Sequence, residues 1–120
     1  MKDAARLLFW FQSASLMIVT VFRSRLAPGT QDEYGPMARY MSELARGIPG
    51  YISHNGFVVE DGEQVTIVEF ESEEALHEWK IHPEHREAKK LGFTKFFSTF
   101  KYQICSVISG RTWESKAGVE

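Results

Sequence analysis

The chain has 120 residues, of which 43% are hydrophobic, and this matches one ordinary globular domain. Its 14 Lys and Arg residues against 16 Asp and Glu residues give a formal net charge of −2, so nucleic acid is not expected as a partner. Since no apolar run approaches the roughly 20 residues that span a bilayer, we expect no membrane segment. The single cysteine, Cys105, excludes an intrachain disulfide and fits the reducing cytoplasm, where we expect the protein.

The first predicted elements are a strand and a long helix. β-branched residues predict a strand over residues 17–25, which ends at a Pro-Gly turn. Thr30 and Glu33 have the spacing of a capping box, so a helix is expected to begin there. Apolar residues at spacings of three and four continue until Gly47 stops the helix, and Pro36 is expected to bend its first turns.

Two further strands are predicted over residues 51–60 and 64–70. They flank Asp61-Gly62, and Asp-Gly is among the strongest short-range signals for a hairpin. Both faces of the second of these strands are apolar, which is typical of a sheet that is covered on both sides. The residues concerned are Val65, Ile67, Val68 and Phe70.

Two short helices and a last strand complete the predicted order. Ser72 is expected to cap the first helix, because acidic residues follow it in the first turn. His82 is expected to cap the second, in which Pro83 takes the first position and Gly92 ends the run. Alternating apolar residues predict a fourth strand over residues 100–108.

The order strand, helix, strand, strand, helix, strand predicts an α+β ferredoxin-like βαββαβ fold with a four-stranded antiparallel sheet. The sheet face away from the helices is too apolar to remain exposed to water, so we expect it to pack against a second copy of the chain. Such a homodimer, formed through the open sheet face, closes a dimeric α/β barrel that has room for a small ligand. We expect the domain over residues 17–109, an N-terminal extension or arm over residues 1–16, and a C-terminal tail over residues 110–120.

Three segments resemble the antibiotic biosynthesis monooxygenase family of dimeric α/β barrels. They are Pro49-Gly50-Tyr51, residues 68–79 (VEFESEEALHEW) and residues 82–85 (HPEH). The resemblance covers roughly residues 17–109 and implies the fold predicted above. For the reaction it implies several possibilities, because the family includes cofactor-independent oxygenases of anthrones and quinols, heme-degrading enzymes and members without known activity.

The heme-degrading branch resembles this chain around Trp79 but departs from it at two positions. Ten residues after Trp79, where that branch has its axial histidine, this chain has Lys89. The asparagine of its first strand corresponds to Phe22. A protonated lysine is no iron ligand, and phenylalanine cannot donate a hydrogen bond to bound oxygen, so no heme is expected.

The cofactor-independent branch implies chemistry carried mainly by an electron-rich substrate, which the protein positions, deprotonates and shields from water. We therefore expect a monooxygenase that oxidises a small aromatic or quinol-like molecule with O2, without metal, flavin or heme. The alternative is a non-catalytic barrel that binds a small apolar metabolite. The expected catalytic residues are His54, His82 and Trp79, and the expected substrate-binding residues are Phe22, Phe57, Phe70, Tyr102 and His85.

Each of these candidates also has a purely structural interpretation. Trp79 lies on the apolar side of its helix, where tryptophan usually packs in the core. In the structural interpretation, His82 simply caps the helix that follows it. His85, which has charged neighbours, then lies on a solvated face. His54 is a general base if its strand face lines the cavity, and a satisfied buried histidine if that face meets the helices.

The remaining polar candidates give weaker signals. The histidines around Pro83 are too loosely spaced for a metal site, and none is expected. Cys105 is interpreted as a small core residue rather than a nucleophile. Arg23 and Arg25 share a strand face, where they either hold an anionic substrate at the barrel mouth or are simply solvated.

Overall fold

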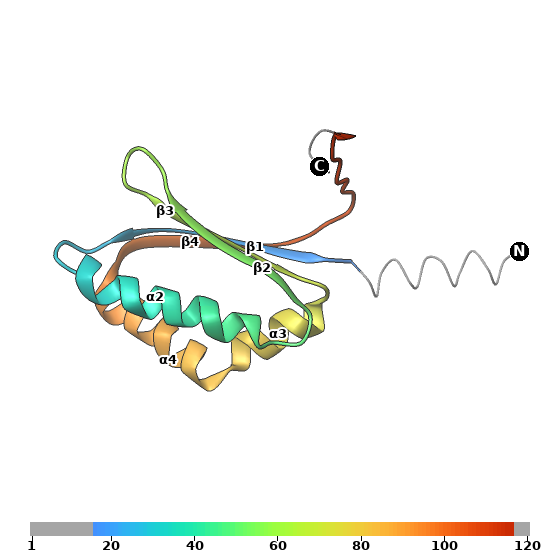
Figure 1. The fold of residues 1–120 in the computed structure, drawn as a ribbon. Helices are drawn as coiled ribbons and strands as arrows, with labels where there is room; N and C mark the ends of the chain where they lie inside the picture. Colours follow the sequence, from blue (N-terminus) through green and yellow to red (C-terminus); the bar gives the residue numbers. More distant parts are fainter. Residues whose placement is uncertain (1–15, 117–120) are drawn as a thin grey trace, which may run out of the picture.

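The computed structural model describes residues 16–116, in which a four-stranded antiparallel sheet is covered by helices on one side only (Figure 1). The strand order is β2-β3-β1-β4, which confirms the predicted α+β ferredoxin-like fold. The elements are β1 (Ile18–Leu26), α2 (Gln31–Arg46), β2 (Tyr51–Val58), β3 (Gln64–Phe70), α3 (Glu73–Ile81), α4 (Pro83–Leu91), a π-helical turn η1 (Gly92–Phe96) and β4 (Phe97–Ser106). Among the described residues, no helix is long and apolar enough to cross a membrane.

The buried core lies between the sheet and the helices. Alternate residues of a strand point to opposite faces, so Ile18 of β1 and its partner Phe70 of β3 share the helix side. The apolar stripe of α2 packs against this group through Met41, Leu44 and Ile48, as the spacing of these residues predicts. The core comprises Ile18, Ala45, Val68, Phe70, Ala75, Leu76 and Trp79.

Local signals place three of the element boundaries where the sequence predicts them. At the β2–β3 hairpin Gly62 has a positive φ of 93°, which glycine adopts without strain. The Oγ atom of Ser72 accepts a hydrogen bond from the backbone N–H of Ala75 at 3.2 Å and caps α3. The Nδ1 atom of His82 accepts one from the N–H of Glu84 at 3.2 Å and caps α4.

Three expectations about the secondary structure and its burial are wrong. Thr30 forms no capping box, because its backbone is already helical and its hydroxyl donates to the carbonyl of Ala27 at 2.7 Å. The last strand begins at Phe97 and not at residue 100: Gly92 ends α4 after Leu91 as expected, but with a helical φ of −57° the chain continues into the π-helical turn η1, which leads directly into β4. Cys105 is exposed, because its strand is an edge of the sheet and the residue lies on the face away from the helices.

The turn that leads into β2 depends on a glycine that lies against α3. Gly50 has a positive φ of 90°, and a Cβ atom at this position would lie 2.7 Å from the Cβ atom of Ala75. Any larger residue would strain the backbone and also push α3 away from the start of β2.

We predict that Gly50→Ala destabilises the fold more than Gly62→Ala. Both positions have positive φ, which costs a non-glycine residue about 1–2 kcal/mol, but only Gly50 has a neighbour within contact distance of the added methyl group. The overlap with Ala75 should cost about 1–3 kcal/mol more. Urea denaturation of the two variants measures the difference, and equal losses would show that the contact with α3 is unimportant.

Candidate functional site

His54 faces the helices because of an irregularity in β2. The pairing of β2 with β3 shifts at Ile52, which is left without a partner on β3. After this shift His54 lies opposite Val68, a core residue on the helix side of the sheet. The strand face of His54 thus meets the helices, which is the case that the sequence associates with a buried histidine and not with a general base in a barrel between two sheets. Burial lowers the pKa of His54, and the positive charge of Arg46 lowers it further.

The corner between α3 and α4 brings Trp79 and His85 into direct contact. Their rings are stacked, with centroids 3.9 Å apart and planes inclined by 12°. The Nδ1 atom of His85 lies 2.9 Å from the carbonyl oxygen of Trp79. Since a carbonyl only accepts hydrogen bonds, Nδ1 carries the proton and donates it, which leaves the Nε2 atom of a neutral His85 as an acceptor.

The electrostatic surroundings of His85 keep it neutral at pH 7. Burial lowers its pKa to about 4, while the hydrogen bond to the Trp79 carbonyl acts in the opposite direction. Positive charge at Lys89, His82 and His54 lowers the pKa further. The interpretation of His85 as a solvated residue is therefore wrong, because the ring is half-buried against Trp79.

His82 completes what we call the histidine group, which consists of His54, Trp79, His82 and His85. The ring centroid of His82 lies 6.1 Å from that of Trp79. Its Nδ1 atom is occupied by the cap of α4, so only Nε2 is left for other contacts. The structure thus brings Trp79 and His82 together with His85, which the sequence suggested only as a substrate contact, while His54 acts on His85 through its charge.

Two of the predicted substrate contacts lie on the helix side of the sheet, and one of them, Phe70, packs in the same core cluster as Trp79. Phe70 is fully buried there. Phe22 of β1 stacks on Phe100 with ring centroids 5.9 Å apart and lies 5.2 Å from the ring of Phe97. Both of these partners were missed in the sequence, although the density of phenylalanine between residues 93 and 100 is the signal that points to them.

The other two predicted contacts lie elsewhere. Tyr102 is on the helix side of β4, opposite Phe22, but this edge strand is largely uncovered and the ring is exposed. Phe57 pairs with Val65 on the opposite face, so it does not line the same space as the histidine group. We call the face that carries Phe57 the open face.

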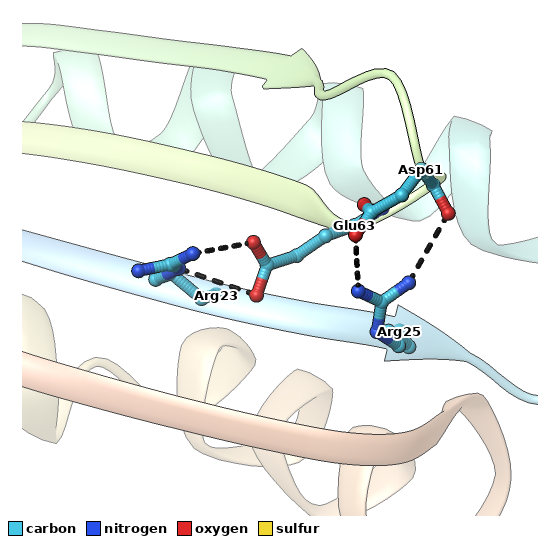
Figure 2. A network of polar contacts seen from close by, with 4 residues as sticks. All are labelled: Arg23, Arg25, Asp61 and Glu63. Carbon is cyan, nitrogen blue, oxygen red and sulfur yellow. Dashed lines mark hydrogen bonds and ion pairs between the residues drawn. The ribbon is translucent and has the colours of Figure 1, made fainter.

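The two arginines of β1 also lie on the open face, where acidic partners bind both of them (Figure 2). Arg23 contacts Glu63 at 2.7 Å and Arg25 contacts Asp61 at 2.9 Å. Exposed ion pairs of this kind contribute little stability. The arginines are thus part of an ion-pair network with the β2–β3 hairpin.

An open hollow of about 460 Å³ lies next to this network and shares no residue with the histidine group. Arg25, Leu26, Gln31 and Gln64 are among its lining residues. Within residues 16–116, the His, Cys, Asp and Glu side chains form no group of three that could hold a metal ion. The histidine group is therefore the most promising site in the described part of the chain.

Comparisons with known proteins agree with the observed fold. The sequence profile described as antibiotic biosynthesis monooxygenase matches residues 17–91. The chain belongs to the antibiotic biosynthesis monooxygenase family. It is 27% identical over 81 residues to the uncharacterized protein YqjZ of Bacillus subtilis, a match that covers 68% of this chain and 71% of YqjZ.

Solved structures show the same fold at low sequence identity. Rv0793 from Mycobacterium tuberculosis has a TM-score of 0.73 and 15% identity, and the match covers 80% of this chain and 99% of that one. A variant of SnoaB, a cofactor-independent oxygenase from Streptomyces nogalater, has a TM-score of 0.68 and 12% identity, with 78% and 95% covered. Members of the family are generally dimers.

We predict that the neutral state of His85 makes the fold sensitive to mild acid. The pKa of His85 is near 6.5 in the unfolded chain and about 4 in the fold, so between these values only the unfolded chain takes up the proton. The free energy of unfolding should thus be constant above pH 7 and fall by roughly 1–2 kcal/mol between pH 6.5 and pH 5. Urea denaturation across this range measures the slope.

His85→Gln, which does not titrate, should lose most of this slope and leave a smaller part from His54. His77 is exposed on α3, so His77→Gln is the matched control and should keep the slope. The same slope in His85→Gln as in the natural chain would contradict the account.

Proposed function

We propose that the protein is a cofactor-independent monooxygenase that oxidises a small aromatic or quinol-like molecule with O2. The observation that carries the proposal is His85, held neutral, with Nδ1 bound to a carbonyl and Nε2 left as an acceptor. A phenol that binds near the histidine group can donate its O–H to this nitrogen. Membership of the family supports the reaction class, and SnoaB is described as a cofactor-independent oxygenase.

The residues of the histidine group have different proposed roles. His85 accepts the substrate proton, and His54, on the helix side of β2, acts on His85 through its charge. Trp79 fixes the ring of His85 by stacking and by its carbonyl, so it is a positioning residue. His82 holds the first turn of α4, which carries His85, in place.

In the proposed reaction the substrate supplies all the electrons. For a phenolic substrate with an activated ring methylene, removal of a proton gives an electron-rich anion that reduces O2. The methylene carbon loses its two hydrogens and gains one oxygen atom as a carbonyl, while the second oxygen atom and the two hydrogens leave as water. The four electrons that reduce O2 come from the substrate carbon, so the balance needs no external reductant. The protein orients the substrate, accepts and returns protons, and limits access of water.

We further propose that the working unit is a cytoplasmic homodimer formed through the open face. The centre of this face carries apolar side chains, and the ion pairs of Arg23 and Arg25 flank it. A face of this composition favours a second sheet over water. The apolar residues are Val19, Val21, Val65, Ile67 and Phe57.

We predict that metal-stripped protein accelerates O2 uptake with at least one member of a panel of hydroquinones, naphthols and anthrones. Removal of a general base typically costs a factor of about 10²–10⁴, so His85→Ala should lower kcat/KM by that order, and His54→Ala should have a smaller effect. His77→Ala, on the exposed side of α3, is the control and should keep full activity. An oxygen electrode measures the rate above the uncatalysed reaction.

Two outcomes contradict the proposal in different ways. Full activity in both His85→Ala and His54→Ala would remove the histidine group from the mechanism. Tight binding of panel members without turnover would instead favour a non-catalytic barrel that holds a small apolar metabolite.

A further inference from the structure

The corner between α3 and α4 carries cations that have no acidic partner (Figure 1). Lys80 lies in the last turn of α3, and Arg86 and Lys89 lie on α4. All three residues are exposed, so a ligand can reach them. Within residues 16–116 the ion pairs form elsewhere, on β1 and η1, and none of them includes these residues. We call Lys80, Arg86 and Lys89 the cation group.

The end of α3 holds Lys89 beside His85. The Nζ atom of Lys89 donates to the carbonyl oxygen of Lys80 at 3.4 Å, and the Nδ1 atom of His85 lies 2.9 Å from the carbonyl oxygen of Trp79. Two consecutive carbonyls therefore hold the two side chains. His85 and Lys89 are four residues apart on α4, so they share one face and lie about 6 Å apart along the helix axis.

The ammonium group of Lys89 is partly desolvated and has no counter-charge. Partial burial is the largest cause that lowers its pKa, and the positive charges of Lys80 and Arg86 lower it further. In the described part of the chain, every charge that acts on Lys89 is thus positive. An ammonium group has three N–H donors, and the carbonyl of Lys80 takes one of them. Two donors are left for a ligand, and an anion is the ligand that compensates the charge.

We propose that the cation group binds a carboxylate of the substrate, so that the molecule oxidised is a phenol or quinol with an acid group on its ring system. This inference rests on the proposed function, because it takes His85 as the acceptor of the hydroxyl proton. A rigid aromatic molecule with a hydroxyl and a carboxylate at opposite ends can reach both His85 and Lys89, which lie about one helical turn apart. An uncharged phenol makes only the first of these contacts.

The bound carboxylate also changes the base strength of His85. In the empty protein, burial and the positive charges of Lys89, His82 and His54 lower the pKa of the ring. A carboxylate at the cation group cancels the charge of Lys89, so the pKa of His85 rises. His85 thus becomes a stronger base when a substrate with the matching charge is bound. The site therefore favours such substrates in kcat as well as in binding.

Isothermal titration calorimetry of the full-length chain tests the proposal with 6-hydroxy-2-naphthoate and its methyl ester. These probes share the ring system and the hydroxyl group and differ in charge. At low salt the naphthoate should bind about three- to tenfold more tightly than the ester. Lys89→Gln should lose this preference, and Lys89→Arg, which restores the charge, should keep it. Lys101→Gln removes the same charge from the open face, so it is the matched control and should also keep the preference.

An NMR titration of His85 shows whether the carboxylate binds at the cation group. The pKa of His85 should rise when the naphthoate binds to the natural chain and should rise much less in Lys89→Gln. An unchanged pKa in the natural chain overturns the proposal. Equal dissociation constants for the two probes, a preference that survives in Lys89→Gln, or no binding of either probe overturns it as well.

The binding test needs no turnover, so its failure is distinct from failure of the oxygenase proposal. A charge preference without O2 uptake leaves the cation group as a ligand site and overturns only the oxygenase. Uptake with uncharged phenols and no charge preference in binding has the reverse meaning, because the oxygenase then stands and the carboxylate site does not.

Discussion

The contact between Trp79 and His85 fixes the corner at which the sheet, α3 and α4 meet. The indole ring of Trp79 belongs to the core, so its position is set by the packing of α3 on the sheet. Its carbonyl, at the end of α3, accepts both the N–H of His82 at 3.3 Å and the Nδ1–H of His85 at 2.9 Å. One residue therefore links the sheet, the helix cap and the proposed catalytic ring: its side chain contacts the core and His85, and its carbonyl accepts the two hydrogen bonds.

The same contact sets the chemistry available to the site. A histidine with a pKa of about 4 is a weak base in the empty protein, but it is an available hydrogen-bond acceptor at pH 7. Its surroundings are cationic, since Arg46 acts on His54, and Lys89 acts on His85. Positive charge near a bound phenol favours its phenolate form, and the phenolate in turn stabilises a protonated His85. Substrate and base thus adjust each other, which suits a reaction that starts with the loss of one proton.

Features set by neighbours in the sequence were predictable, and features set by distant packing were not. Ser72 and His82 cap their helices because a cap needs only the next two or three backbone N–H groups. The unpaired Ile52, which decides the face of His54, depends on how β2 packs beside β3 and leaves no clear signal in the sequence. Cys105 looks like a core residue by its apolar neighbours, and only the strand order shows that it lies on an exposed edge. The charged neighbours of His85 suggested that its side chain is exposed to solvent. The bend at the α3–α4 corner instead places its ring on that of Trp79.

The protonation state and tautomer of His85 test the central claim most directly. Long-range ¹H–¹⁵N NMR spectra of the full-length protein, with His85→Gln to assign the signals, report which ring nitrogen carries the proton at each pH. The account predicts a neutral ring at pH 7 with the proton on Nδ1, which titrates only when the pH falls towards about 4. A ring that carries its proton on Nε2, or that titrates near its usual value of 6.5, would contradict it.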